Sequence, residues 1–208
     1  MSQIVLATKN QGKILEFQRL LSKHAGEVKV LGLSDFPDLP DVEESGKTLS
    51  ENAKLKAKAI SDFTNLPALA DDSGLFIDAL NSDPGILSAR WGGYQGSDSA
   101  TRDQINIRKV LDQLKDVPLA DRSAQFKAVV YFYMKKSNGE IIEKEELGVL
   151  PGVIITEPRG SGGFGYDPIF VPVGFDQTLA EISPEVKDEV SHRGIAMRAM
   201  TTFLLSNQ

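Results

Sequence analysis

The sequence predicts an α/β fold in which a mixed β-sheet is flanked by helices. Strand and helix patterns alternate in the first part of the chain, and a long hairpin follows in the second part. Together these patterns indicate a sheet that combines strand-helix units with a hairpin. The chain has 208 residues, of which 41% are hydrophobic, so it can bury the core of one domain or of two closely fused lobes.

The chain begins with a predicted strand, a short polar loop and a helix. Residues 4–8 form a short apolar run, and the helix is expected over about residues 13–23. Its inner face would carry apolar residues at helical spacing, namely Ile14, Phe17, Leu20 and Leu21. Residues 28–33 predict a second strand, and residues 36–46 predict an acidic loop that contains prolines.

A second helix is expected to begin after Thr48. The Thr48 hydroxyl and Glu51 have the spacing of a capping box. A packing face continues from there through Ala53, Ala57 and Ile60. Two short strands follow, over residues 68–71 and 75–80, and Asp72-Ser73-Gly74 predicts a tight break between them.

The second half of the chain predicts a hairpin between long strands. A helix over about residues 100–114 leads into a strand over residues 124–134. Asn138-Gly139 predicts a type I′ turn, because these residues tolerate the positive φ angles that the turn requires. The chain then returns through residues 141–149, and shorter strands are expected over 153–156 and 169–171.

The C-terminal segment predicts helices. Ser183-Pro184 is typical of a helix start, with proline in the first turn. Ser191 is expected to cap a last helix that ends near residue 205. No internal repeat or linker divides the sequence, which favours a single folded region.

The composition excludes several kinds of site. The chain has no cysteine and only two histidines, His24 and His192, so thiolate catalysis, iron–sulfur clusters, Cys/His zinc sites and disulfides are excluded. A bound metal would be held mainly by oxygen. The formal charge of -6 argues against a protein that coats nucleic acid, although a small anionic ligand is compatible with it. The N-terminal apolar run is too short for a signal or a membrane span, which favours the cytoplasm.

The loop after the first strand is a candidate anion site. It contains Thr8, Lys9, Asn10, Gln11, Gly12 and Lys13. Free N–H groups at a helix start, a glycine and lysines together can bind an anion. The segment is not a Walker A loop, which requires Gly in place of Ala7 and Ser or Thr in place of Ile14. Taken alone, it is equally compatible with an ordinary polar loop.

The segment Gly160-Ser161-Gly162-Gly163-Phe164-Gly165 matches the letters of a dinucleotide-binding fingerprint, but its context excludes that site. The fingerprint must open a helix, whereas Pro168 and Pro172 indicate extended chain here. The glycines could instead let a loop close over a flat ligand, on which Phe164 could stack. A flexible surface turn is the alternative, and the glycines alone slightly favour it.

Two acidic pairs form a candidate metal site. Glu43-Glu44 lies in the acidic loop, and Asp71-Asp72 follows an apolar run at a strand end. Mg²⁺ prefers oxygen ligands and commonly bridges a carboxylate and substrate phosphates, so the pairs could meet around one such ion. Taken alone, Glu43-Glu44 is more typical of a solvated surface.

Lys187 and Ser191-His192-Arg193 form a further candidate site near a helix start. Arg193 in particular could grip a carbonyl or a phosphate through two hydrogen bonds. A solvated helix end is the simpler interpretation of these residues, and the same holds for Lys56 and Lys58.

Several short motifs follow one another along nearly the whole chain. They are Ala7-Thr8-Lys9-Asn10-Gln11-Gly12-Lys13, Glu44-Ser45-Gly46, Glu51-Asn52-Ala53-Lys54-Leu55-Lys56-Ala57, Ala70-Asp71-Asp72-Ser73-Gly74-Leu75, Pro84-Gly85-Ile86, Ser88-Ala89-Arg90, Gly162-Gly163-Phe164-Gly165-Tyr166-Asp167-Pro168 and Ser191-His192-Arg193. In this order the chain resembles the inosine/xanthosine triphosphate pyrophosphatase family, which hydrolyses non-standard purine nucleoside triphosphates. The resemblance implies one ITPase-like domain over residues 1–208, with an elongated central sheet and two lobes around a cleft.

The resemblance also implies roles for the matching residues. Residues 8–13 would bind the triphosphate, with Lys13 as the main cation and Lys56 as a second one. Glu44 and Asp72 would hold Mg²⁺, and Asp72 would also accept a proton. Further substrate contacts are implied for Ser73, Phe164, Gly165, Tyr166, Asp167, Lys187, His192 and Arg193.

The implied reaction is the attack of water on the α-phosphorus with loss of pyrophosphate. Asp72 or Asp71 would orient the water, and Lys13 and Lys56 would neutralise charge on the leaving group. Two alternatives are an enzyme directed at modified pyrimidine triphosphates and a catalytically silent nucleotide-binding protein. The family resemblance further implies a homodimer, and the charge and the apolar pattern favour a protein that binds neither nucleic acid nor a membrane.

Overall fold

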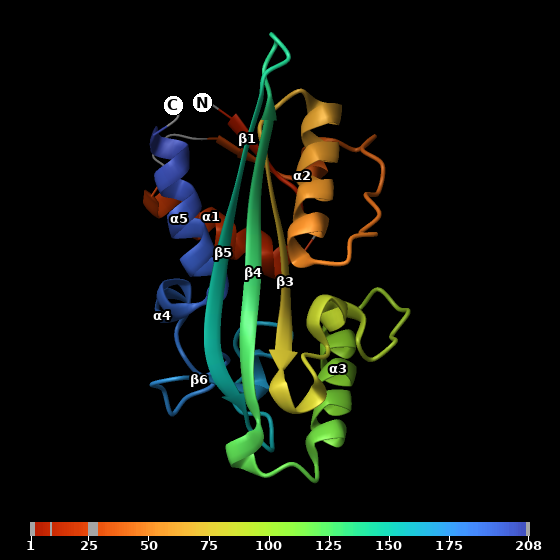
Figure 1. The fold of residues 1–208 in the computed structure, drawn as a ribbon, viewed down its shortest axis with the longest axis vertical. Helices are drawn as coiled ribbons and strands as arrows, with labels where there is room; N and C mark the ends of the chain where they lie inside the picture. Colours follow the sequence, from red (N-terminus) through yellow and green to blue (C-terminus); the bar gives the residue numbers. More distant parts are fainter. Residues whose placement is uncertain (1–2, 9, 25–28, 207–208) are drawn as a thin grey trace. The chain divides into compact units, whose positions relative to one another are not determined.

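The computed structural model describes residues 3–8, 10–24 and 29–206, and it confirms the predicted mixed α/β fold (Figure 1). The strands form a sheet in the order β2-β1-β3-β4-β5-β6. Their bounds are β1 (Gln3–Leu6), β2 (Lys29–Leu31), β3 (Ala68–Ile77), β4 (Ser123–Lys135), β5 (Ile141–Ile154) and β6 (Phe170–Pro172). The sheet is mixed, because β1 pairs in parallel with β2 and β3 whereas β5 pairs antiparallel with β6.

The helices lie close to their predicted positions. They are α1 (Gln11–His24), α2 (Leu49–Thr64), α3 (Ser99–Leu114), α4 (Pro184–Val190) and α5 (His192–Ser206). Short 3₁₀ helices cover Leu33–Asp35, Asp78–Leu80, Gly85–Arg90, Leu119–Asp121 and Asp167–Ile169. Within the described ranges, no helix is both long and apolar enough to cross a membrane.

The chain divides into two compact units. The first unit comprises Met1–Asp72, Ala128–Gly148 and Arg193–Gln208, and the second comprises Ser73–Lys127 and Val149–His192. The boundaries fall inside β3, β4 and β5, so each of these strands contributes residues to both units. The cleft implied by the family resemblance stays a prediction.

Each unit has its own hydrophobic core. In the first unit one core cluster draws buried residues from β1, α1, β3, β4 and α5, and its members are Ile4, Leu6, Phe17, Leu20, Leu69, Val130, Phe132, Ala196, Met197, Met200 and Leu204. The predicted inner face of α1 is confirmed for Phe17 and Leu20, and Ile14 packs against this core, whereas the Leu21 side chain lies outside the described residues. In the second unit the largest fully buried side chains include Leu75, Ile77, Leu114, Ile154, Ile169 and Phe170. Burying a Leu, Ile or Phe side chain stabilises the fold by about 1.5–3 kcal/mol.

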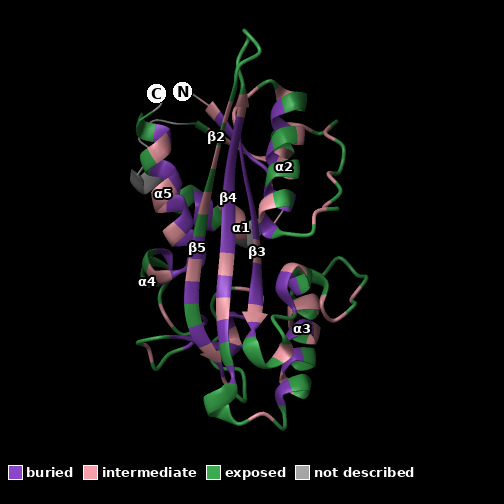
Figure 2. Cartoon of the chain, in the orientation of Figure 1, coloured by how far each residue is buried: buried purple, intermediate pink, exposed green. Residues whose placement is uncertain are grey.

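The two strands of the long hairpin differ in burial. β4 is buried along most of its length, whereas the first half of β5 alternates between exposed and half-buried residues (Figure 2). The exposed positions are Ile141, Glu143, Glu145 and Leu147, and the half-buried residues between them are Ile142, Lys144 and Glu146, so the exposed positions carry both polar and apolar side chains. One face of this part of β5 is therefore in solvent, as expected of an antiparallel hairpin.

The hairpin is confirmed, but its predicted turn type is wrong. Gly139 has a positive φ of 85°, whereas Asn138 does not belong to the positive-φ residues, so the turn cannot be type I′. The Gly139 N–H donates to the Lys136 carbonyl at 2.9 Å, and the Lys136 N–H donates to the Glu140 carbonyl at 2.8 Å. This is a three-residue loop in which glycine supplies one left-handed residue at the end. After the turn, β5 continues unbroken to Ile154, where two separate strands were expected.

The predicted helix starts are largely confirmed. The Thr48 hydroxyl accepts from the Glu51 N–H at 3.1 Å, and the Ser183 hydroxyl accepts from the Val186 N–H at 3.3 Å. The second half of the predicted capping box is wrong, because the Glu51 carboxylate accepts from the Lys47 N–H at 2.6 Å and not from Thr48.

The predicted break at Asp72-Ser73-Gly74 is wrong, because β3 runs through it as one strand. Gly74 is needed there for close packing and not for a turn. A Cβ atom at Gly74 would lie 2.2 Å from the carbonyl oxygen of Gly85, so only glycine lets the two backbone segments approach this closely. The Gly85 segment is itself held against β3, since the Ile77 N–H donates to the Asp83 carbonyl at 3.2 Å.

This close approach makes Gly74 intolerant of a side chain. Gly74→Ala is expected to lower the free energy of unfolding by about 1–3 kcal/mol, because backbone must shift to admit the new methyl group. Urea denaturation measures the loss. Gly32→Ala is the control, since a Cβ atom there would meet nothing closer than the Ser34 hydroxyl at an ordinary 3.4 Å. Equal losses in the two variants would contradict this explanation of Gly74.

Candidate active site

Asp71 and Asp72 are neighbours on β3 and contact different helices of the first unit. Successive side chains of a strand point to opposite faces of its sheet. Asp71 accordingly contacts Lys13 of α1 and Arg193 of α5, whereas Asp72 contacts residues of α2. The two carboxylates are adjacent in the sequence but contact different partners.

Asp71 is the centre of a buried charge network. Its Oδ2 lies 2.7 Å from Lys13 Nζ and 3.4 Å from Arg193 Nε. Arg193 Nη1 in turn lies 3.3 Å from a carboxylate oxygen of Glu16, which is also buried. Burial opposes the ionisation of Asp71, but the charges of Lys13, Arg193 and Lys56 outweigh it and lower the pKa of Asp71 to about 2. Asp71 is therefore an anion at neutral pH.

Asp72 is held by two residues of α2. Its Oδ2 accepts from Asn52 Nδ2 at 3.1 Å, and its Oδ1 lies 3.7 Å from Lys56 Nζ. Burial raises the pKa of Asp72, and the charges of Lys56 and Lys13 only partly oppose this effect. A carboxylate that binds a proton more readily than usual is a candidate general base.

Lys56 joins the predicted metal ligands. Its Nζ lies 2.7 Å from Glu44 Oε1 and donates to the backbone carbonyl of Asp71 at 2.7 Å. Burial acts against the charge of this lysine, but the carboxylates of Asp71, Asp72 and Glu44 outweigh it and raise the pKa of Lys56. Lys56 is thus a firmly charged cation between two acidic side chains.

The donor set around Lys56 fits a hard divalent cation. Glu44 and Asp72 come from different segments and converge on the same ammonium group, so their oxygens already lie around one positive charge. Mg²⁺ is commonly bound by one or two carboxylates together with waters and substrate phosphates. The described residues contain no group of three or more His, Cys, Asp or Glu arranged to hold a metal, so the chain itself would supply these two carboxylates. Of the two acidic pairs in the sequence, Glu43 is exposed and Asp71 pairs with Lys13.

The loop before α1 forms the start of that helix. The Thr8 hydroxyl accepts from the Asn10 N–H at 3.2 Å, and the Asn10 side-chain oxygen accepts from the Lys13 N–H at 3.3 Å. Asn10 therefore caps α1, whose N-terminal end attracts anions. Gln11 and Gly12 lie in the first turn, although nothing is described of their side chains, and Lys9 lies outside the described residues.

The glycine-rich loop of the second unit is built around Asp167. The Asp167 Oδ2 accepts from the Phe164 N–H at 2.8 Å and from Lys187 Nζ at 2.7 Å. Gly163 has a φ of 72°, and a Cβ atom there would lie 2.1 Å from the same oxygen. The Lys187 ammonium also lies 4.8 Å from the centre of the Phe164 ring. These contacts argue against the flexible surface turn that the glycines alone favoured.

Two further contacts tie this loop to its own unit. The Gly165 N–H donates to Asp103 Oδ2 of α3 at 2.7 Å. The Tyr166 hydroxyl donates to the Ser88 carbonyl at 2.9 Å, and burial raises the pKa of Tyr166. The polar end of Tyr166 is thus committed to the protein interior. The short 3₁₀ helix Asp167–Ile169 replaces the fully extended chain that was expected after the loop.

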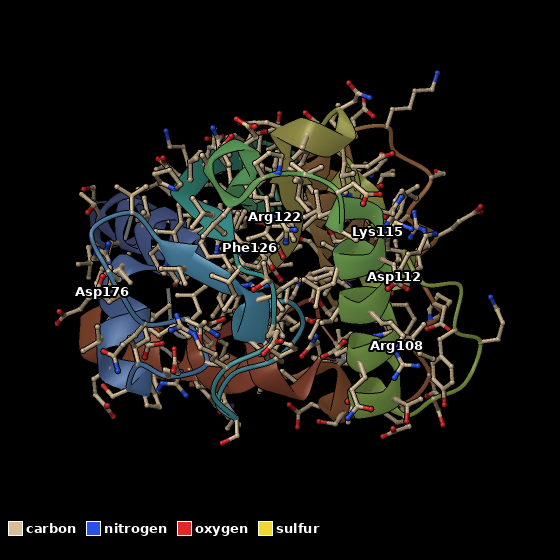
Figure 3. The ribbon with its side chains drawn as sticks, turned by 90° about the horizontal axis from the view of Figure 1, so that it is seen from below. Arg108, Asp112, Lys115, Arg122, Phe126 and Asp176 are labelled. Carbon is tan, nitrogen blue, oxygen red and sulfur yellow. The ribbon has the colours of Figure 1, made fainter. Side chains whose placement is uncertain are left out.

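His192 is buried in the second unit. Its ring stacks on Phe126 with 4.7 Å between ring centres and 7° between planes, and Phe126 lies in the interior on β4 (Figure 3). Ser73 is half-buried and directly follows Asp72.

The predicted site residues therefore fall into two groups. Thr8, Asn10, Lys13, Glu44, Lys56, Asp72 and Arg193 belong to the first unit, and Ser73, Phe164, Gly165, Tyr166, Asp167, Lys187 and His192 belong to the second. The contacts above connect Lys13, Asp71 and Arg193 directly, and Glu44, Lys56 and Asp72 directly. Lys58 pairs instead with Asp62 on the surface of α2, as a solvated helix residue would.

Sequence reasoning missed three residues that hold the candidate site residues. They are Glu16 beside Arg193, Asn52 beside Asp72 and Asp103 beside Gly165. Asn52 could have been noticed, because it is a polar residue next to Ala53 on the predicted packing face of its helix. For Asp103 the sequence holds no local signal, since its partner is 62 residues away.

Comparison with known proteins gives consistent matches over nearly the whole chain. The model of the Ham1 family matches residues 4–203. The chain is 43% identical over 204 residues to a dITP/XTP pyrophosphatase of Halalkalibacterium halodurans, covering 98% of this chain and 100% of that protein. It is 45% identical over 209 residues to a dITP/XTP pyrophosphatase of Cutibacterium acnes, covering 100% and 98%. The solved structure of a HAM1 protein from Coxiella burnetii superimposes with a TM-score of 0.84 at 43% identity, covering 99% of this chain and 100% of that one.

Proposed function

The chain belongs to the Ham1 family, and on that premise we propose that it hydrolyses non-standard purine nucleoside triphosphates, such as ITP, dITP and XTP, to the monophosphate and pyrophosphate. The observation that carries the proposal is the convergence of Glu44 and Asp72 on Lys56, beside a helix start that bears Lys13. Acidic side chains next to half-buried lysines suit a ligand that combines phosphates with a divalent cation.

In the proposed reaction Asp72 takes a proton from water as the water oxygen bonds to the α-phosphorus. The bond from that phosphorus to the oxygen of the β-phosphate breaks, and pyrophosphate leaves. The raised pKa of Asp72 suits this carboxylate to accept the proton. The Lys13 and Lys56 ammonium groups would neutralise charge on the departing pyrophosphate.

Glu44 and Asp72 are the residues proposed to hold Mg²⁺. When bound, the ion would supply positive charge to the phosphate oxygens. Lys56 would then share these carboxylates with the ion, and its firm positive charge would remain available to the substrate.

The base is proposed to bind near Phe164, Lys187 and His192, which all belong to the second unit. The flat Phe164 ring can stack on a purine. Hypoxanthine and xanthine carry an acceptor at position 6 where adenine carries a donor, so a nitrogen donor there would discriminate between them. An unpaired buried donor costs about 1–3 kcal/mol, which corresponds to roughly tenfold to hundredfold discrimination.

A substrate panel tests the proposed function. With Mg²⁺, the chain is expected to release pyrophosphate and monophosphate from ITP, dITP and XTP at least tenfold faster than from ATP, dUTP or TTP. The products are separated by ion-exchange chromatography and pyrophosphate is assayed directly. Preference for dUTP would favour the pyrimidine-directed alternative, and binding of ITP without turnover would favour the silent binding protein. Release of orthophosphate from ITP would also refute the proposal.

We also propose a homodimer, which the family resemblance implies, and a cytoplasmic location, which the sequence alone favours. Sedimentation equilibrium of the purified chain tests the first of them, because a single species of monomer mass at micromolar concentration would contradict it. Fractionation of the source cells tests the second.

A further inference from the structure

We propose that Asn52 is a positioning residue, whose side-chain amide fixes the Asp72 carboxylate relative to the loop that carries Glu44. This inference rests on the function proposed above, in which Asp72 accepts the proton. Asn52 contacts an oxygen of the reacting Asp72 carboxylate but does not itself react.

Asn52 uses both ends of its amide. It is completely buried on α2, its Nδ2 donates to Asp72 Oδ2 at 3.1 Å, and its Oδ1 accepts from the Gly46 N–H at 2.8 Å. An amide offers two donors and one acceptor oxygen, so one side chain can satisfy a carboxylate and a backbone N–H together. Asn52 thereby links β3 to the segment two residues after Glu44.

Asn52 also acts together with Lys56, one helical turn later. Residues four apart lie on the same helix face. Asn52 contacts Asp72 Oδ2 and Lys56 faces Asp72 Oδ1, so each carboxylate oxygen has its own partner from α2. Asp72 Oδ1 and the Glu44 carboxylate therefore face the same ammonium group, that of Lys56.

The loop is shaped to reach this amide. A Cβ atom at Gly46 would lie 2.6 Å from Asn52 Oδ1 and 2.7 Å from the Glu51 Cβ. Any side chain at Gly46 would therefore push the loop away from the amide. The glycine and the asparagine form one contact, and the contact holds Glu44 near Lys56.

A carboxylate without such a contact has a loosely defined orientation. The terminal torsion of aspartate has a broad minimum, and a displacement of about 1 Å at a reacting group can reduce catalysis by about 10²-fold. Loss of a group that orients a metal ligand typically reduces metal affinity or activity by about 10- to 100-fold. The fixed Asp72 plane is the property that Asn52 is proposed to supply.

The test compares Asn52→Ala with the same substitution at a matched asparagine, Asn106. Asn106 is also buried, its Oδ1 accepts from the Gly92 N–H at 2.6 Å, and its Nδ2 lies 3.3 Å from the Ser88 carbonyl. It anchors a loop in the same way, but its hydrogen-bond partners among the described residues are all backbone groups. Both alanine variants are expected to melt at similarly lower temperatures by circular dichroism.

Only Asn52→Ala is expected to lose catalytic activity, because only this substitution leaves the Asp72 carboxylate without its orienting contact. Its kcat for ITP should fall about 10- to 100-fold with a KM within about threefold of the unchanged chain. Asn106→Ala should keep its kcat within about threefold. A merely structural role would make the two variants alike, so equal kcat values at equal melting temperatures would overturn the proposal.

Gly46→Ala tests the same contact from the loop, with Asn52 intact, and it serves if Asn52→Ala does not fold. It should lower kcat by a similar factor, and the double variant should be little worse than either single one, because neighbours that act as one unit are not additive. Multiplied losses in the double variant would overturn the link between loop and amide.

Absence of ITP turnover by the unchanged chain would refute the proposed function, and the positioning role with it. Turnover by the unchanged chain with an unaffected Asn52→Ala would refute the positioning role alone.

Discussion

Asn in place of Asp72 is expected to reduce ITP turnover by about 10²- to 10⁴-fold and to leave the chain folded. A fall in turnover of this size is typical of the loss of a general base. The substitution preserves the size of the side chain and lets Asn52 and Lys56 keep a polar neighbour. Lys56 retains Glu44 at 2.7 Å and the Asp71 carbonyl at 2.7 Å, so its charge stays compensated. Loss of structure is therefore not expected to explain loss of activity.

Pyrophosphate release from ITP at saturating Mg²⁺ measures this effect, and circular dichroism confirms the fold. Two neighbouring glutamates provide the control. Glu44→Gln should reduce turnover and raise the Mg²⁺ concentration needed for half-maximal rate, whereas Glu43→Gln should change neither, because Glu43 is exposed. Near-normal turnover by Asp72→Asn would remove Asp72 from the proposed chemistry.

The sequence predicted those parts of the fold that local patterns determine. Apolar spacing placed α1 with Phe17 and Leu20 inside, and the Thr48 and Ser183 caps placed two helix starts. The continuity of β3 was missed, because glycine in a sequence signals a turn and a close packing contact equally well. Gly74 serves the second purpose, and its partner Gly85 lies in a later segment of the chain.

The candidate site was predictable to the extent that its residues belong to recognisable motifs. The motifs led to Glu44, Lys56 and Asp72, which the structure brings into contact. They did not indicate which carboxylate of the Asp71-Asp72 pair would meet which lysine. That division follows from the alternation of β3, which becomes informative only once the break at Gly74 is known to be absent.

The buried network around Asp71 leads to the largest expected effect on stability. Asp71→Ala would leave the half-buried Lys13 ammonium and the buried Arg193 guanidinium without their shared acceptor. Removing one partner of a buried ion pair typically costs about 3–5 kcal/mol. Urea denaturation at pH 7 measures the loss. Asp62→Ala, which removes the exposed partner of Lys58, should cost less than about 1 kcal/mol, and equal losses would show that the Asp71 network contributes no special stability.

The same network should make this loss depend on pH. The pKa of Asp71 falls from its ordinary value of 3.8 to about 2 in the folded chain, although burial alone would raise it, because Lys13 and Arg193 favour the ionised form. A lowered pKa in the folded state contributes stability that is present above pH 3.8 and is lost as the pH falls through about 2. The free-energy difference between the unchanged chain and Asp71→Asn should therefore narrow by roughly 2 kcal/mol between pH 6 and pH 2. Unfolding free energies measured across that range decide the matter, because a difference that stays constant would mean that the charge of Asp71 does not stabilise the fold.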